Sequence, residues 1–230
     1  MKTVLIIAAH PDDEVLGCGG VITKFSAEKK SVHVALLTGG ILSRHAGLSA
    51  KAIKELELNR ENAIAANKIL GVAPQNIHFL GLEDQKLDTV PQHELIQTLK
   101  KLLAEIKPDM VFCHHPGDYN KDHRVTYEAV LYATRVSPGE TYVQRVYTYE
   151  VLSSTERSFG SIQPFVPNTY VDIASALEKK KEALATYMSE LHPDPHPRSL
   201  LGVDTLARHR GMEIGTKAAE AFHLVRSLGL

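Results

Sequence analysis

Cysteine is scarce in this chain, because only Cys18 and Cys113 occur among its 230 residues. Two cysteines cannot build a disulfide framework, and such low usage is typical of a reduced compartment. Each cysteine lies in an apolar run, where a lone thiol is usually a small packing group rather than a metal ligand. We therefore expect a cytoplasmic protein without disulfides.

The chain also lacks a basic tract and a long apolar run. Its formal net charge is -1, so nothing favours a nucleic-acid groove or an anionic membrane surface. No apolar run approaches the ~20 residues that a membrane-spanning helix needs. The N-terminal apolar run ends directly in charged residues without a small-residue cleavage site, which argues against a signal peptide. We expect no nucleic-acid partner and no membrane span.

Strand-like and helix-like stretches alternate through the first two-thirds of the chain, which favours a parallel sheet with crossover helices. Strands are predicted at 3–9, 32–37, 77–80, 110–113, 142–151 and 169–173, and helices at 13–28, 49–70, 91–106, 122–135, 173–188 and 203–227. We find no internal repeat, low-complexity tract or linker-like composition shift. The prediction is one α/β domain over residues 1–230, with a Rossmann-like doubly wound, mostly parallel sheet flanked by helices.

Three carboxylates and an imidazole crowd into His10-Pro11-Asp12-Asp13-Glu14, directly after the first predicted strand. Open parallel sheets keep their ligand sites at such strand-to-helix turns. The acidic residues could simply cap the helix that follows. His10 favours a different function, because an imidazole and the Asp13 carboxylate converging from a fixed turn suit a cation such as zinc.

Glycines follow this turn in Gly17-Cys18-Gly19-Gly20 and raise the alternative of a dinucleotide site. That site needs its glycines within the turn, so that a pyrophosphate can rest on the helix N-terminus. Here carboxylates hold the turn and would repel a phosphate, and Ile22 stands where the third glycine should be. We reject a dinucleotide site and attribute the glycines to close approach of another backbone or a ligand.

A second polar cluster, Asp118 to His123, follows the fourth predicted strand. In a sheet of order 3-2-1-4-5, strands one and four are neighbours, and the loops at their ends meet. Catalytic zinc usually has three protein ligands. We therefore expect His10, Asp13 and His123 to hold one zinc ion, although His123 could also be an exposed first-turn histidine.

The run Ala9 to Glu14, together with Asp122-His123-Arg124, resembles the LmbE-like (PIG-L) zinc-dependent N-acetylglucosamine deacetylases over essentially the whole chain. The resemblance implies His10, Asp13 and His123 as zinc ligands and Asp12 as the general base. It implies a hydrolase that removes acetyl from an N-acetylglucosamine-type amino sugar or glycoconjugate with a water molecule that the metal activates. It also implies a homo-oligomer, either a trimer or a hexamer.

One position departs from the family pattern. Many members carry a histidine three residues before the last zinc ligand, and here that residue is Asn120, which can donate a hydrogen bond but carries no charge. The missing cation could come from His115, or from His192 or His196 in a proline-rich loop. Asp122 could orient the neighbouring ligand His123.

Polar side chains in other loops at the same sheet edge could contact a sugar. Arg44 and Asp84 follow the second and third predicted strands, and either could instead be a solvated loop charge. Arg198 could bind an anionic substrate group or form a surface ion pair, and the lysines at 179–181 are most simply a solvated helix face. The candidate substrate contacts are Arg44, Asp84, His115, Asn120, His192 and His196.

Two alternatives to an amino-sugar deacetylase stay open. A metal-dependent amidase could act on an N-acylated amine that is not a sugar. A catalytically idle module could keep the metal turn and bind metal or sugar without turnover.

Overall fold

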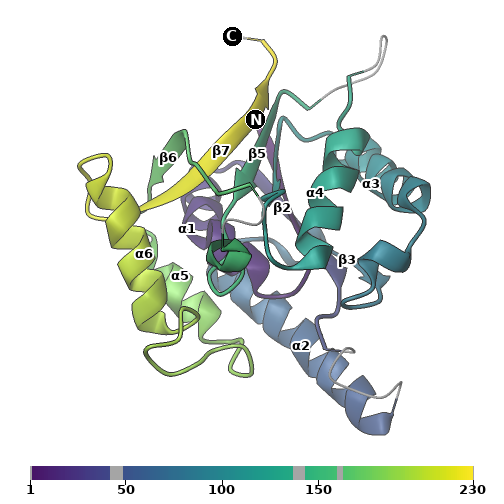
Figure 1. The fold of residues 1–230 in the computed structure, drawn as a ribbon, viewed down its shortest axis with the longest axis horizontal. Coiled ribbons are helices and arrows are strands. Elements are labelled where there is room, and N and C mark those ends of the chain that lie inside the picture. The colour runs from purple at the N-terminus through teal and green to yellow at the C-terminus, as the bar shows by residue number, and fades with distance from the viewer. Residues whose placement is uncertain (1, 42–48, 137–142, 160–162, 230) are drawn as a thin grey trace.

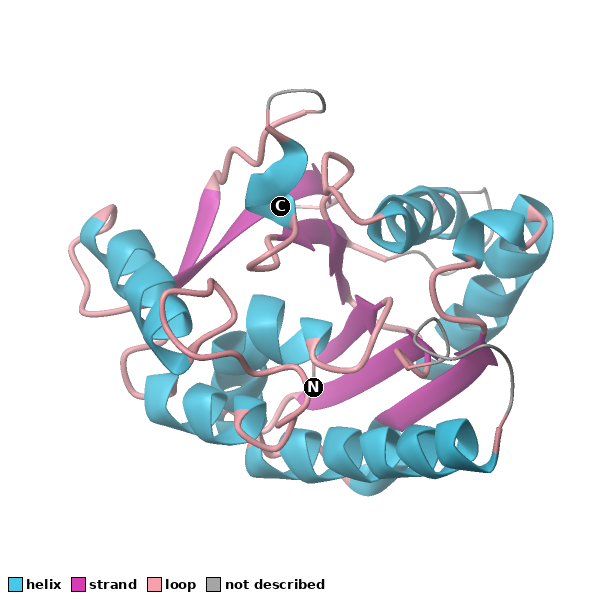
Figure 2. Ribbon diagram, turned by 60° about the horizontal axis from the view of Figure 1, so that its bottom comes forward, coloured by secondary structure: helices cyan, strands magenta, loops and turns pink. Residues whose placement is uncertain are grey.

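The computed structural model describes residues 2–41, 49–136, 143–159 and 163–229. The strands are β1 (Thr3–Ala8), β2 (Ser31–Thr38), β3 (Ile77–Leu82), β4 (Met110–His114), β5 (Arg145–Tyr149), β6 (Thr169–Asp172) and β7 (Ala219–Ser227). The α-helices are α1 (Asp13–Ala27), α2 (Ala50–Ile69), α3 (Gln92–Ile106), α4 (Lys121–Ala133), α5 (Leu177–Leu184) and α6 (Leu200–Met212). Figures 1 and 2 show helices on both faces of the sheet.

The strands form one sheet of order β3-β2-β1-β4-β5-β7-β6. The first five strands in this order run parallel to one another, whereas β7 runs antiparallel to both β5 and β6. The predicted α/β class and the order 3-2-1-4-5 are confirmed. The chain reverses its direction of winding between β1 and β4, so the carboxyl ends of these strands border a crevice. One domain over residues 1–230 stays a prediction.

The sheet has a hydrophobic core on each face, because successive side chains of β1 point in opposite directions. Val4 and Ile6 face the core shared with α1, α2 and α5, and Leu5 and Ile7 face the core shared with α3 and α4. All four side chains are fully buried. This explains the continuous apolar run of β1, which is covered on both faces.

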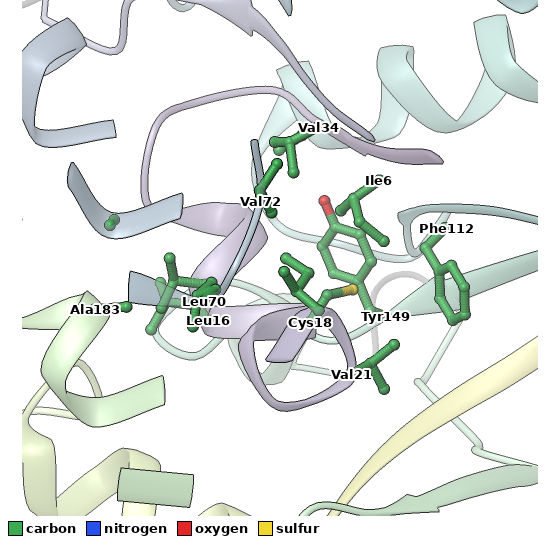
Figure 3. Packing of buried hydrophobic residues seen from close by; sticks show 14 of the residues in the cluster. Ile6, Leu16, Cys18, Val21, Val34, Leu70, Val72, Phe112, Tyr149 and Ala183 are labelled. Atoms are coloured by element: carbon green, nitrogen blue, oxygen red, sulfur yellow. The ribbon is translucent and has the colours of Figure 1, made fainter. Parts of the chain in front are cut away.

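Figure 3 shows part of the first core, with the ring of Tyr149 beside Cys18 and Ile6. Both cysteines are buried and free, as predicted. A side chain at Gly17 would place its Cβ 2.2 Å from the Tyr149 ring, and one at Gly20 would meet Ile173 at 2.6 Å. The close approach predicted for these glycines is therefore real, but side chains make it rather than another backbone or a ligand.

The prediction of a final helix over residues 203–227 is wrong. Helix α6 ends at Met212, and residues 219–227 form β7 between β5 and β6. The apolar residues of β7 are spaced so that they imitate a helical stripe, and pairing with two distant strands decides the structure instead. Gly211 marks the reversal, because a Cβ there would lie 2.7 Å from the backbone nitrogen of Ala218.

Lys180 also differs from its prediction, because it is buried and not part of a solvated face. Helix α5 is shorter than predicted and turns this lysine toward α1. The Lys180 ammonium donates to the carbonyl of Leu16 (2.8 Å) and pairs with Glu220 on β7 (2.6 Å). Glu220 in turn accepts the N–H groups of Gly20 and Val21, each at 2.8 Å. One buried ion pair thus ties α5 and β7 to α1.

No helix in the described ranges is long and apolar enough to cross a membrane.

Candidate active site

Three candidate ligands from two distant parts of the chain meet at the carboxyl ends of β1 and β4. His10 follows β1, Asp13 begins α1, and His123 lies in the first turn of α4. Asp13 Oδ2 lies 3.1 Å from His10 Nδ1 and 3.2 Å from His123 Nε2, and these two nitrogens are 3.3 Å apart. All three residues are buried.

This triangle fits a small divalent cation. A tetrahedral metal with bonds of 2.0–2.2 Å separates its ligand atoms by about 3.3–3.6 Å, close to the observed spacings. Asp13 Oδ1 is buried without a hydrogen-bond partner, so its carboxylate has acceptor capacity left for a cation. Two imidazole nitrogens and one carboxylate are a donor set that zinc and several other divalent metals accept.

Carboxylates hold the far side of each imidazole. His10 Nε2 lies 3.2 Å from Asp122 Oδ2 and 3.3 Å from Asp84 Oδ1, and His123 Nδ1 lies 3.1 Å from Asp118 Oδ1. Such partners fix the tautomer and orientation of a metal-binding histidine. His10, Asp84 and Asp122 are themselves close enough to be a metal group. We interpret these two carboxylates as partners of the imidazole, because they approach the nitrogen that faces away from Asp13.

Asp122 was expected to orient His123, and its carboxylate contacts His10 instead. Successive helical residues point about 100° apart, so the Asp122 carboxylate turns away from His123 and lies against Nε2 of His10, whereas His123 lies against Nδ1 of the same ring. The backbone N–H groups of Gln85 and Leu87 donate to the Asp122 carboxylate at 2.8 Å and 3.1 Å. The Asp122 carboxylate therefore links the loop after β3 to His10.

Asp118 has the position beside His123 that sequence reasoning gave to Asp122. It accepts hydrogen bonds from Ser154 and from Thr155 Oγ1 (2.6 Å), both of which follow β5. Burial disfavours its charge, but the His123 charge and these hydrogen bonds outweigh burial and lower the pKa of Asp118 to about 2. Burial likewise opposes a charge on His123, and Asp13 and Asp118 raise the pKa of His123 to about 9. The site thus has a surplus of negative charge that favours a cation.

Asp12 lies beside the three candidate ligands and points to a cleft. Its backbone has a φ of 108°, which is unusual for a residue with a side chain and often marks a functional site. Arg198 Nη1 donates to Asp12 Oδ2 at 3.0 Å, and the Asp12 N–H donates to Glu14 Oε2 at 3.0 Å. Burial raises the pKa of Asp12, and the Arg198 guanidinium opposes that shift.

The cleft has a volume of about 100 Å³. Its lining includes His10, Asp12, Asp84, Asn120, Glu190 and Arg198. A second pocket of about 200 Å³ shares Pro11 with it. Its lining is mostly apolar but includes Thr38, Glu57 and Arg60, and the Arg60 guanidinium carbon lies 3.8 Å above the Phe79 ring. The polar cleft beside Asp12 therefore adjoins a more apolar pocket.

The other predicted contacts separate into two groups. Asp84 and Asn120 line the cleft. His115 faces the carbonyl of Gln163 (3.0 Å), and His192 and His196 pack against each other with ring centroids 4.1 Å apart. None of these three histidines is among the described residues that line the cleft. Arg44 lies outside the described residues.

Sequence reasoning missed two groups in the site. Arg198 was weighed only as a contact for an anion or as a surface charge, and it pairs with Asp12 across 186 positions. His114 ends β4, and its ring stacks on His123 with centroids 3.8 Å apart. The only signal for His114 was its place at the end of a strand that borders the crevice.

Comparisons with known proteins find a matching family and several named relatives. Residues 5–134 match the family described as "PIG-L: GlcNAc-PI de-N-acetylase". The chain is 30% identical over 197 residues to a probable N-acetyl-alpha-D-glucosaminyl L-malate deacetylase 2 of Bacillus anthracis, covering 82% of this chain and 81% of the relative. It is 27% identical, over an alignment 241 positions long, to the diacetylchitobiose deacetylase of Thermococcus kodakarensis, covering 100% of this chain and 85% of the relative.

Among solved structures, the N,N'-diacetylchitobiose deacetylase of Pyrococcus horikoshii matches with a TM-score of 0.77 and 25% identity, covering 97% of this chain and 84% of that one. Its solved structure includes an inhibitor. The fold similarity extends over both halves of the chain and so includes the strands after residue 134.

Proposed function

Because the chain belongs to the PIG-L (GlcNAc-PI de-N-acetylase) family, we propose that it is a metal-dependent hydrolase that removes the N-acetyl group from an N-acetylglucosamine-type amino sugar or glycoconjugate. Its named relatives are deacetylases, which hydrolyse an amide bond. One observation carries the proposal. His10, Asp13 and His123 bring three ligand atoms within 3.3 Å of one another beside the buried carboxylate of Asp12.

The proposed ligands are His10, Asp13 and His123, and the proposed metal is zinc. Zinc accepts this combination of nitrogen and oxygen ligands, and three protein ligands leave a position open for catalysis. When bound, the metal supplies Lewis acidity and makes water a nucleophile near neutral pH. Asp84, Asp118 and Asp122 keep the two imidazoles oriented for it.

Asp12 is the proposed general base. Its carboxylate lines the cleft and takes a proton from the attacking water molecule. The same carboxyl group then returns the proton to the amine that leaves. Burial raises the pKa of Asp12, which favours the return of the proton from this carboxyl group to the amine.

Asn120 is the proposed hydrogen-bond donor to the acetamide oxygen. Its Oδ1 accepts the N–H of Asp122 at 2.9 Å, and only the oxygen of an amide group can accept that bond. The amide NH₂ group is therefore the part that remains for a ligand in the cleft. Unlike a histidine at this position, it supplies no charge.

A test of the proposal is acetate release from a panel of N-acetylated amino sugars, with and without a chelator. We expect release that stops on chelation and returns with zinc. Release from acylated amines that are not sugars, and from no sugar, would favour the amidase alternative. Bound metal without turnover of any acylated amine would contradict the proposal and favour a binding module. The trimer or hexamer and the cytoplasmic location remain predictions.

A further inference from the structure

The turn that carries Asp12 is held by residues from much later in the chain. Arg198 lies between α5 and α6, outside the family match to residues 5–134, and donates to Asp12 Oδ2 at 3.0 Å. Tyr187, just after α5, donates to Glu14 Oε1 at 2.7 Å. Glu14 Oε2 accepts the Asp12 N–H at 3.0 Å. The same late segment therefore holds both the carboxylate and the backbone of this residue.

We propose that Arg198 is a positioning residue that holds the Asp12 carboxylate in its reactive orientation. This rests on the proposed function, in which Asp12 is the general base. Arg198 binds only Oδ2, and Asp12 Oδ1 makes no hydrogen bond to a described residue. A contact to one oxygen fixes the carboxylate plane and leaves the other oxygen for the transferred proton.

The guanidinium of Arg198 is itself held in place, which distinguishes it from a mobile surface charge. Its Nε donates to the carbonyl of Leu152 at 3.2 Å, and its backbone N–H donates to His196 Nδ1 at 3.1 Å. Its side chain is 20% exposed and that of Asp12 only 3%. An ion pair this shielded is screened far less than an exposed one, and an Arg fork loses little freedom on binding.

The surroundings of Asp12 make Arg198 hard to replace. Asp13 and Glu14, the two residues that follow Asp12, are buried carboxylates. A third carboxylate oxygen, Glu190 Oε2, lies 3.8 Å from Arg198 Nη1. Within the described ranges, Arg198 is the only cationic side chain in ion-pair distance of Asp12. Without it, repulsion from these neighbours would turn the Asp12 carboxylate away from its present orientation.

A double-mutant cycle of Arg198→Gln and Asp12→Asn tests the inference. We expect Arg198→Gln to lower kcat by about 10- to 100-fold, part of the contribution of a general base, with KM and metal content within about twofold. In the Asp12→Asn background the same change should cost less than about twofold, because no base remains to be positioned. Arg198→Lys should recover part of kcat, since it restores the charge without the planar fork.

The matched control is Arg208→Gln, which breaks an exposed ion pair with Asp204 on α6 and should leave kcat unchanged. Equal losses from Arg198→Gln in both backgrounds would overturn the inference, and so would a raised KM with normal kcat, which would make Arg198 a substrate contact. If Arg198→Gln does not fold, Arg198→Lys and Tyr187→Phe carry the same cycle.

A crystal structure of Arg198→Gln gives a readout that needs no substrate. We expect the Asp12 carboxylate to rotate away from the cleft while the three metal ligands stay in place. An unmoved carboxylate would contradict the positioning role even if no acetylated sugar is turned over. A wild-type protein without activity would contradict the proposed function. The position of the Asp12 carboxylate in the Arg198→Gln crystal structure would still decide whether Arg198 holds that carboxylate in place.

Discussion

Asp12 and His10 are only two positions apart, yet the proposed function gives them different roles, which mutation can separate. Asp12→Asn keeps the shape of the side chain and removes the proposed base, so we expect it to retain metal and lose about 10²- to 10⁴-fold in kcat. His10→Ala removes a proposed ligand and should lose both metal and activity. Acetate release and metal content per chain, measured on the same preparations, distinguish the two. Parental activity in Asp12→Asn would remove it from the base role.

Arg60 is the residue that we expect to affect substrate binding without entering the chemistry. Its guanidinium lies over Phe79 in the pocket that adjoins the cleft through Pro11. A charge-assisted hydrogen bond from it to a sugar hydroxyl would contribute about 1.5–3 kcal/mol. Arg60→Met should therefore raise KM about tenfold or more and change kcat little. Lys54→Met, an exposed change on the same helix, is the control, and equal KM values in the two variants would contradict a substrate contact.

The candidate ligands could be predicted from sequence because their signals are local. His10 and Asp13 share the turn after β1. His123 follows β4, which is the neighbour of β1 at the switch point. Arg198 had no such signal, because nothing near it in sequence specifies a partner 186 positions away. The predicted contact of Asp122 with His123 was wrong for a similar reason. Motif spacing does not report which way a side chain points at the start of a helix, and the Asp122 carboxylate points to His10.

At the scale of elements, the contact between α1, α5 and β7 depends on the buried pair of Lys180 and Glu220. Removing one member of a buried pair leaves the other charge uncompensated, at a cost of about 3–5 kcal/mol. Lys180→Met should lower the free energy of unfolding by an amount in this range. Lys179→Met changes the exposed neighbour and should stay within about 0.5 kcal/mol. Urea unfolding of both variants is the measurement, and equal midpoints would show that the pair contributes little.

The elements that sequence reasoning predicted well are those whose periodicity reflects burial by immediate neighbours. The all-apolar run of β1 is an example, because both of its faces are covered. β7 is the opposite case. Its residues Ala219 to Phe222 are buried by β5, β6 and α1, and these contacts override a spacing that imitates a helix. Long-range antiparallel pairing leaves no mark on local periodicity.

At the scale of the whole molecule, the fold brings residues from most of the chain to one edge of the sheet. The turn after β1 provides His10 and Asp12, the start of α4 provides His123, and the segment after α5 provides Arg198. The alternation of strands and helices predicted the first two, since it fixes which strand ends meet. It could not predict that the C-terminal part folds back over the turn after β1.

Zinc titration into metal-stripped protein, with acetate release followed at each addition, tests the central claim most directly. The claim is that His10, Asp13 and His123 bind one metal ion and that this ion is required for hydrolysis. We expect activity to rise in proportion to added zinc and to reach its plateau at one equivalent per chain, with His10→Ala inactive throughout. Stripped protein as active as reloaded protein, or a plateau that needs two equivalents, would contradict the account.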